Sequence, residues 1–359
     1  MLIIRRYKET YSLPFSENIP CYLSAYLPQI KKPSRVIKYI KRYLFLFLKK
    51  EIRNEKEKIS GYDKKILWIN KSATSLGDSL MDLSSRTLLK SKNVDLLTDK
   101  KNAHIYANDS VFKNIFYDTQ TIKERAYDLI ILDSFSTRTV SIKNKLFPKT
   151  NFVSMFGFFN GPEVNRVLFS FHRLNYLLGL EMSSSEIGQI AHPSMDISKV
   201  KFIKLPNEFI TIAVGGEWEY RTYNNWLEVV SIILEKYKNI KILLVGSENG
   251  KDCAKLIMSK FPNGQVVDCV GKYSYKETSS IISKSRIFIG CDGGLMHAAN
   301  CFNRILVPLF ARLEPKMQLT ESMLAFSEFD KNDVNNISVD AVMRNFDRAF
   351  KVSQKFHQN

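Results

Sequence analysis

The chain has 359 residues, 45% of them hydrophobic and 25% charged, with a formal net charge of +17. This length predicts two folded domains, and the composition excludes a disordered or fibrous protein. The five cysteines form no C-x-x-C pair, so the sequence favours neither a disulfide framework nor a zinc site. We expect a cytoplasmic protein, because no secretory signal and no apolar run of roughly 20 residues, as a membrane span requires, is recognisable.

Residues 1–63 are expected to form a basic, amphipathic extension in front of the first domain. Between Lys31 and Lys65, 13 basic residues stand against four acidic ones, and an apolar run occupies residues 43–48. This pattern suits the headgroup region of an anionic membrane surface. The alternative is a helix that packs its apolar side on the protein and solvates its charges. The residues expected at the membrane surface are Lys41, Arg42, Phe45, Phe47, Lys49 and Lys50.

Two further expectations concern this extension. Nucleic acid is not an expected partner, because no helix-turn-helix, RNP or zinc-finger pattern accompanies the positive charge. We also expect deletion of the first 60 or so residues to weaken binding to anionic vesicles while the rest of the chain stays folded.

Beyond the extension, short apolar runs alternate with segments long enough for crossover helices, which predicts parallel sheets. The first array has strands at residues 65–69, 94–97, 129–132 and 152–156 and a helix at 79–89, in a domain of residues 64–180. The second array has strands at 209–214, 242–245, 266–270, 287–290 and 305–310, in a domain of residues 207–335. Residues 181–206 are the expected linker. Residues 336–359 contain an amphipathic helix that could pack on either domain.

The turn after the first strand contains Ser75-Leu76-Gly77-Asp78. Asp78 falls near the start of the next helix, where it could be an N-cap residue. It could equally be a carboxylate that removes a proton from an attacking hydroxyl. The turn is neither a G-x-G-x-x-G dinucleotide fingerprint nor a Walker A loop, because the required glycines and lysine are absent.

The turn after the strand at residues 287–290 combines Asp292, Gly293, Gly294 and His297. Open α/β sheets bind ligands at such strand ends, where glycines allow close approach and helix N–H groups attract anions. The alternative is a plain strand-to-helix turn, with Asp292 as its N-cap and His297 packed in the core.

Two other turns of the second array carry chargeable side chains. Gly215-Gly216 is followed by Arg221, whose guanidinium could clamp a phosphate or could simply be solvated. Glu248 follows the next strand, where a carboxylate could accept hydrogen bonds from ribose hydroxyls.

Taken together, these motifs resemble glycosyltransferase family 9, the bacterial heptosyltransferases of the lipopolysaccharide inner core. Residues 75–78 resemble the family's S-L-G-D turn, and residues 292–299 resemble its D-[ST]-G-x-x-H-[LA]-A signature. Residues 309–315 echo the following L-[FY]-G-x-T-x-P segment, and the resemblance covers roughly residues 64–350. Gly293 departs from the pattern by replacing Ser or Thr, and residues 303–305 and 311–313 also differ.

The resemblance implies a GT-B fold, in which two Rossmann-like domains face each other across a cleft. It implies an inverting, metal-independent transfer of a heptose or related sugar to a lipid-linked core oligosaccharide, at the inner face of the inner membrane. The donor would be a nucleotide-diphosphate sugar such as ADP-heptose, with no further cofactor. Asp78 would deprotonate the acceptor hydroxyl.

The resemblance also assigns a donor site. Arg221 would hold the diphosphate, Asp292 the donor sugar, and Glu248 the ribose. The remaining implied donor contacts are Tyr273 beside the nucleobase and Gly293, Gly294 and His297 facing the phosphates. Open alternatives are a hexosyltransferase of the same family, another GT-B enzyme such as a sugar-nucleotide epimerase, and a non-catalytic nucleotide-sugar-binding protein.

Overall fold

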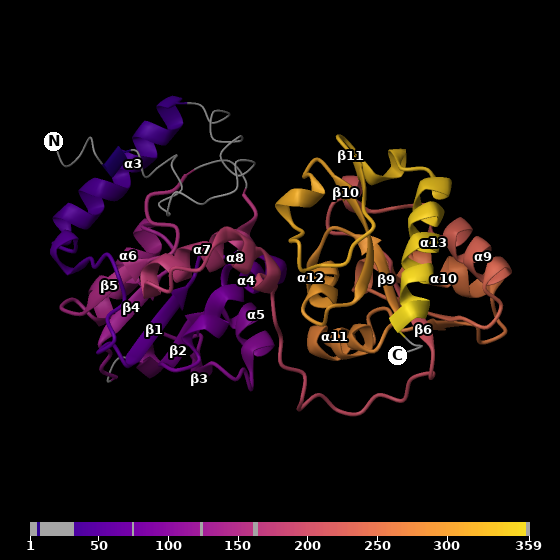
Figure 1. Ribbon diagram of the computed structural model, residues 1–359, viewed down its shortest axis with the longest axis horizontal. Helices are drawn as coiled ribbons and strands as arrows, with labels where there is room; N and C mark the ends of the chain where they lie inside the picture. Colours follow the sequence, from indigo (N-terminus) through magenta and orange to yellow (C-terminus); the bar gives the residue numbers. More distant parts are fainter. Residues whose placement is uncertain (1–5, 8–31, 74, 123–124, 161–163, 357–359) are drawn as a thin grey trace. The chain divides into compact units, whose positions relative to one another are not determined.

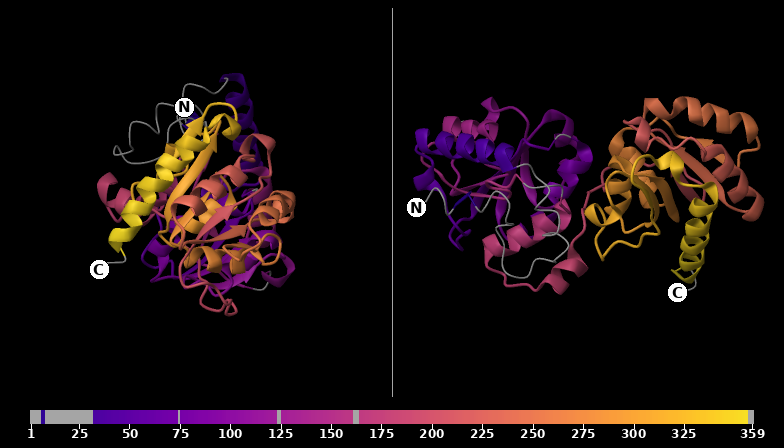
Figure 2. Two further views of the ribbon diagram at one scale, coloured as in Figure 1. Left: turned by 90° about the vertical axis from the view of Figure 1, so that its right-hand side faces the viewer. Right: turned by 90° about the horizontal axis from the view of Figure 1, so that it is seen from above.

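The computed structural model describes residues 6–7, 32–73, 75–122, 125–160 and 164–356. The chain divides into two compact units, Met1–Asp196 and Ile197–Asn359 (Figures 1 and 2). Each unit is a parallel β-sheet with helices packed around it. This is the predicted fold class, two α/β units of Rossmann-like organisation.

The sheet of unit 1 has the strand order β3-β2-β1-β4-β5, with every neighbouring pair parallel. Its strands are β1 (Lys65–Asn70), β2 (Asn93–Thr98), β3 (Phe112–Phe116), β4 (Leu129–Leu132) and β5 (Asn151–Ser154). Residues 66–69 and 129–132 are buried throughout, as expected of strands covered on both faces. Its helices are α3 (Lys32–Leu48), α4 (Leu76–Asp82), α5 (Lys100–Ala103), α6 (Thr137–Leu146), α7 (Arg166–Leu178) and α8 (Ser184–Ile190).

The basic extension is part of unit 1. Tyr39 and Leu46 of α3 are buried in the same core cluster as Leu67 of β1. After α3, the carboxylate of Glu51 pairs with the ammonium of Lys143, and both side chains are fully buried. This packing argues that deletion of the first 60 or so residues would destabilise unit 1, because it would strip side chains from the core and leave Lys143 without its counter-ion.

Two residues expected at a membrane surface point toward the body of unit 1 instead. Arg42 Nη1 donates to the carbonyl oxygens of Phe158 and Phe159 at 3.3 and 3.1 Å. Burial lowers the pKa of this guanidinium from its ordinary value. Phe45 is half-buried and packs against the core. Helical periodicity places both side chains on the inner side of α3, which the apolar run alone did not reveal.

The sheet of unit 2 has the order β11-β10-β9-β6-β7-β8, again with parallel neighbours. Its strands are β6 (Phe209–Ala213), β7 (Lys241–Val245), β8 (Val266–Asp268), β9 (Ile287–Cys291), β10 (Ile305–Ala311) and β11 (Glu328–Asp330). Its helices are α9 (Trp226–Lys236), α10 (Lys251–Lys260), α11 (Tyr275–Ser283), α12 (Gly294–Asn300) and α13 (Val339–Phe356).

The C-terminal helix belongs to unit 2. Val342 and Phe346 of α13 are fully buried in the core cluster that contains Ile233 of α9 and Val307 of β10. Phe346 and Phe350 pack against the ring of Tyr237, with ring centroids 5.5 and 4.2 Å away. Of the two domains on which this helix could pack, it therefore covers the second (Figure 1).

Three details differ from the expected elements. The short strands β3 and β11 were not predicted, because most of their residues are exposed or only half-buried. The helix expected at 79–89 ends at Asp82 and continues as a 3₁₀-helix over Ser84–Leu89, where the Ser84 hydroxyl donates to the Met81 carbonyl at 2.7 Å. Residues 184–190, within the expected linker, form α8, and the boundary between the units follows at Asp196.

Candidate functional site

The sheet of unit 2 reverses its strand order between β6 and β9. The chain proceeds from β6 outward to β7 and β8, then returns to place β9, β10 and β11 on the other side of β6. In open α/β sheets, ligands bind at the carboxyl ends of the strands beside this switch point. The turns after β6 and β9, which carry Arg221 and Asp292, both leave the sheet there.

Arg221 and Asp292 form an ion pair across the switch point. Arg221 Nη1 lies 3.2 Å from Asp292 Oδ2, and the exposed fractions of the two side chains are 27% and 3%. Gly216 allows the turn that brings Arg221 back, since a Cβ there would lie 2.5 Å from Thr222 Oγ1. Arg221 Nε is buried and has no hydrogen-bond partner among the described residues. The guanidinium therefore retains a donor that an anion could occupy.

Asp292 also approaches the imidazole of His297. His297 Nε2 lies 3.9 Å from Asp292 Oδ1, and both side chains are nearly inaccessible. The N-cap of α12 is Gly293, with no side-chain cap hydrogen bond, so the alternative reading of Asp292 as the N-cap is wrong. The carboxylate lies between a cation and an imidazole, an arrangement that fixes its position at the strand end.

Tyr275 supports the same turn and was not identified from the sequence. Its hydroxyl donates to the Gly294 carbonyl at 2.6 Å. A Cβ added to Gly294 would lie 3.6 Å from the Tyr275 ring. Nothing in the sequence around Tyr275 indicated this contact.

Glu248 and Tyr273 lie on turns at the other side of β6, after β7 and β8. The Glu248 carboxylate is 71% exposed and pairs with Lys251 Nζ at 2.5 Å. A Cβ on Gly271, whose φ is +67°, would lie 2.5 Å from Glu248 Oε1, so these two turns touch. Tyr273, two residues further on, is half-buried. The structure thus brings Glu248 and the Tyr273 turn together, beside the turn of Arg221.

Arg312, which follows β10, adds a second cation near Arg221. Its guanidinium carbon lies 3.8 Å from the centroid of the Tyr220 ring, and that of Arg221 lies 5.3 Å from the same centroid. Arg312 has a φ of +65° and donates from Nε to the Asn332 carbonyl at 3.1 Å. The only indication of Arg312 in the sequence was that residues 311–313 depart from the family pattern.

In unit 1, Asp78 occupies the third position of α4 rather than its N-cap. Ser75 is the N-cap, and the two residues form a capping box: Asp78 N–H donates to Ser75 Oγ at 3.1 Å, and Ser75 N–H donates to Asp78 Oδ2 at 3.1 Å. Arg166 Nη1, from the start of α7, lies 3.1 Å from Asp78 Oδ1. The Asp78 side chain remains 22% exposed, so solvent still reaches it.

Two buried carboxylates near this turn were missed by sequence reasoning. Asp82 forms an ion pair with Arg166. Burial raises the pKa of the Asp82 carboxyl, while the Arg166 guanidinium lowers that pKa. Asp133, at the end of β4, accepts hydrogen bonds from the backbone N–H groups of Lys71, Ser72 and Ser134 at 2.6–2.8 Å. Asp133 therefore ties the turns after β1 and β4 together at the switch point of this sheet, although burial raises its pKa. Asp133 could have been identified from the sequence, because it is an acidic residue directly after an apolar strand.

The other four residues expected at a membrane surface are exposed, namely Lys41, Phe47, Lys49 and Lys50. Among the described residues, no group of three or more His, Cys, Asp or Glu could hold a metal ion. Within the same ranges, no helix has the length and apolar character needed to cross a bilayer.

The family comparison covers the part of the chain that contains this site. Residues 159–326 match the model of glycosyltransferase family 9 (heptosyltransferase). This match spans 168 of the 359 residues, so the similarity to family 9 covers just under half of the chain. The matched segment includes every residue of the expected donor site, namely Arg221, Glu248, Tyr273, Asp292, Gly293, Gly294 and His297. Asp78 lies outside it.

Solved heptosyltransferase and family 9 structures share the fold of this chain along nearly their whole length. ADP-heptose lipopolysaccharide heptosyltransferase II of E. coli is 15% identical, with a TM-score of 0.63 over 81% of this chain and 99% of that one. A family 9 glycosyltransferase of Veillonella parvula is 11% identical, with a TM-score of 0.63 over 82% and 99%. E. coli heptosyltransferase WaaC with ADP is 14% identical, with a TM-score of 0.60 over 80% and 98%.

At these identities the structural likeness establishes the GT-B fold. A comparison with curated proteins gives no match. The family match and the shared fold together identify the chain as a glycosyltransferase.

Proposed function

We propose that this glycosyltransferase moves a heptose, or a closely related sugar, from a nucleotide-diphosphate donor to a lipopolysaccharide or lipooligosaccharide core acceptor. The proposed reaction inverts the anomeric carbon and needs no metal ion or other cofactor. ADP-heptose is the proposed donor, since solved neighbours include a heptosyltransferase named for ADP-heptose and another bound to ADP.

The observation that carries the proposal is the arrangement of Arg221, Asp292 and His297 beside the switch point of unit 2. A nucleoside diphosphate gains negative charge as the glycosidic bond breaks. Arg221 could stabilise that charge through its unpaired Nε, and more strongly in the transition state than in the ground state. Asp292 holds Arg221 in place and is proposed to contact the donor sugar, with His297, Gly293 and Gly294 toward the phosphates.

The neighbouring turns are proposed to bind the nucleoside. The exposed carboxylate of Glu248 can accept hydrogen bonds from ribose hydroxyls, and Tyr273 can flank the base. Arg312 offers a second guanidinium close to the same Tyr220 ring as Arg221, which supports binding of a doubly charged diphosphate.

Asp78 is the proposed base that takes the proton of the acceptor hydroxyl. Its carboxylate is fixed by Ser75 and Arg166 yet remains accessible to solvent, as a base must be to meet a substrate. An acceptor with acyl chains would place the enzyme at the inner face of the inner membrane, on an anionic surface.

The first test is a transfer assay with a panel of nucleotide sugars and a core-oligosaccharide acceptor. We expect transfer from ADP-heptose with inversion, unaffected by a metal chelator. Isomerisation of the free donor without transfer would show an epimerase. Transfer from a hexose donor would indicate a hexosyltransferase, and tight donor binding without turnover would indicate a binding protein.

The second test separates catalysis from helix capping at Asp78. We expect Asp78→Asn to lower kcat on the order of 100-fold or more while donor binding persists. The matched control is Ser75→Ala, which breaks the other half of the capping box but keeps the carboxylate, at a stability cost of about 1 kcal/mol. Turnover of Asp78→Asn close to that of wild type would reduce Asp78 to a capping residue.

The third test addresses Arg221. Arg221→Gln removes a charged hydrogen-bond donor and should weaken binding of ADP on the order of 10-fold to 100-fold, measured by calorimetry. Lys255→Gln, which removes an equally positive but exposed charge on α10 of the same unit, should leave ADP affinity unchanged. ADP affinity that is the same in both variants would remove Arg221 from the donor site.

A further inference from the structure

Helix α3 exposes a continuous apolar stripe on its outer side. Ile37, Ile40, Leu44, Phe47 and Leu48 are 67%, 47%, 51%, 62% and 73% exposed. The first four follow one another at intervals of three or four residues, and Leu48 lies four residues after Leu44, so all five lie on one face of the helix. Contiguous exposed apolar residues of this kind mark an interaction surface, whereas isolated ones do not. We call these five residues the outer stripe.

The opposite face of α3 packs on the core of unit 1, so the outer stripe faces away from that core. Tyr39 is 3% exposed and Leu46 is fully buried, and both join the core of unit 1. Tyr39 also packs edge-on against Phe158, with ring centroids 5.1 Å apart. Because these side chains hold the inner face, α3 cannot rotate to bury its outer stripe without leaving the core.

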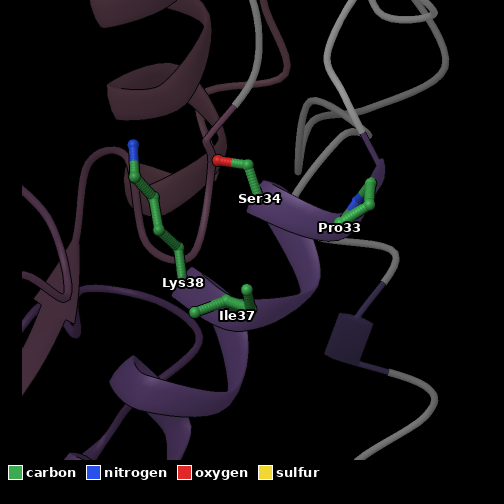
Figure 3. Close-up of a pocket in the computed structure, with 4 residues that line it drawn as sticks. All are labelled: Pro33, Ser34, Ile37 and Lys38. Carbon is green, nitrogen blue, oxygen red and sulfur yellow. The ribbon is translucent and has the colours of Figure 1, made fainter.

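Basic residues border the outer stripe. Helix α3 contains no acidic residue, and Lys38 and Lys41 are exposed beside the stripe, followed by exposed Lys49 and Lys50. The next acidic residue, Glu51, is buried against Lys143 and offers no outward charge. At the first turns of α3, Pro33, Ser34, Ile37 and Lys38 line an open hollow (Figure 3). The surface is therefore apolar along its centre and cationic at its margin.

We propose that the outer stripe of α3 docks in the headgroup region of an anionic phospholipid bilayer. Apolar side chains of an interfacial helix lie at the boundary of headgroups and acyl chains, while lysines remain among the phosphates. The alternative occupants fit less well. A second copy of the chain would bring two sets of lysines together, and a nucleic acid would leave the apolar residues in contact with phosphates.

This inference deepens the proposed function by naming the surface through which the enzyme would reach a lipid-linked acceptor. The two can fail separately, because vesicle binding is measured without sugar nucleotide or acceptor. The inference rests on the exposed and buried residues of α3 itself.

The test is sedimentation of the full chain with vesicles of phosphatidylglycerol and phosphatidylcholine, and with phosphatidylcholine alone. We expect binding to the anionic vesicles that weakens with salt. Ile40→Gln, Leu44→Gln and Phe47→Gln combined should lower the affinity on the order of 100-fold, since glutamine keeps the helix but removes the inserted apolar area. Replacing Lys38, Lys41 and Lys49 by glutamine should lower it about 5-fold for each lysine.

A matched control removes the same kind of side chain elsewhere. Tyr117, Phe202 and Leu256 are 55%, 86% and 52% exposed, and their combined replacement by glutamine should leave vesicle binding unchanged. Circular dichroism and thermal melting confirm that each variant is folded. Equal vesicle binding by wild type and the folded stripe variant would overturn the proposal. So would a wild-type dimer that the stripe substitutions dissociate, because the stripe would then be an interface between copies.

Discussion

Arg166 holds the buried carboxylate of Asp82 in a bidentate ion pair, with Nε and Nη2 at 2.7 and 2.6 Å from the two oxygens. The remaining guanidinium nitrogen, Nη1, reaches Asp78 at 3.1 Å. One arginine at the start of α7 therefore orients the proposed base and compensates a carboxylate that is only 3% exposed. The S-L-G-D turn gains its geometry from a residue 88 positions away in the sequence.

We predict that Arg166→Gln lowers the free energy of unfolding by about 3 kcal/mol, because it leaves the carboxylate of Asp82 buried without a counter-charge. Asp82→Asn in the same chain should recover most of this loss, since the buried charge is then absent. Urea denaturation of the two single variants and the double variant measures the coupling. A loss that is the same with and without Asp82 would mean that the ion pair does not stabilise unit 1.

The buried pair of Glu51 and Lys143 gives a second prediction. Lys143 is fully buried, and desolvation lowers its pKa from the ordinary value while Glu51 raises it. Lys143→Met should destabilise the protein by about 3–5 kcal/mol because it isolates the Glu51 carboxylate. Combining it with Glu51→Leu should restore stability to within about 1–2 kcal/mol of wild type, because an apolar pair can replace a buried ion pair.

Chemical denaturation of these variants also tests whether the extension is part of the fold of unit 1. If Lys143→Met is no less stable than wild type, the segment around Glu51 is detached in solution. Deleting residues 1–63 would then leave unit 1 folded, in contrast to what the buried Glu51, Tyr39 and Leu46 imply.

The architecture was predictable because its main signals are local. Apolar runs such as residues 66–69 and 129–132 become fully buried parallel strands, and the turns around Asp78 and Asp292 fall at strand ends where the sequence places them. What could not be predicted depends on contacts between distant segments. The sequence does not show that Arg166 meets Asp78, nor that Arg312 stacks on Tyr220.

The basic extension also shows that the sequence alone does not reveal contacts between distant segments. The sequence identified a basic segment with an apolar run, and two readings, membrane contact and packing, stood open. The structure shows packing on the inner face of α3 and leaves the outer face exposed, and that outer face is the one proposed to contact a membrane. Arg42 and Phe45 were misassigned because a linear run of residues does not record which way each side chain turns.

Gly293 provides a third prediction, because no steric reason requires a glycine there. Its φ of 171° is extended backbone, and a Cβ would approach only the Cys291 carbonyl oxygen, at 3.9 Å. Gly293→Ser should therefore be neutral or stabilising by up to about 1 kcal/mol, through a less flexible unfolded chain. It also restores the hydroxyl of the family signature, and we expect tighter binding of ADP.

Gly215→Ala is the matched comparison for Gly293→Ser. Gly215 has a φ of +86°, and a Cβ there would lie 2.8 Å from the backbone of Gly250. We expect this variant to lose more than about 1 kcal/mol of stability by urea denaturation. Comparable losses at both positions would show that the turn after β9 is as constrained as the turn after β6. Weaker ADP binding by Gly293→Ser would show that the open space at Gly293 is needed by the ligand.

His172 of α7 supplies a prediction about pH. The side chain is 3% exposed, its Nε2 has no hydrogen-bond partner among the described residues, and burial lowers its pKa from 6.5 to about 4. When the pH falls through this window, the unfolded chain binds a proton at His172 and the folded chain does not. The free energy of unfolding must therefore decrease as the pH falls from about 6.5 towards 4.

The expected size of this effect is about 2 kcal/mol between pH 7.5 and pH 5, from one proton and 1.36 kcal/mol per pKa unit. His172→Leu removes the titrating group, so wild type minus variant isolates its contribution. Asp82 and Asp133, whose pKa values are raised by burial, act in the opposite direction and cancel in this difference. Parallel stability curves for wild type and His172→Leu over this pH range would mean that the folded protein protonates His172 as readily as the unfolded chain does.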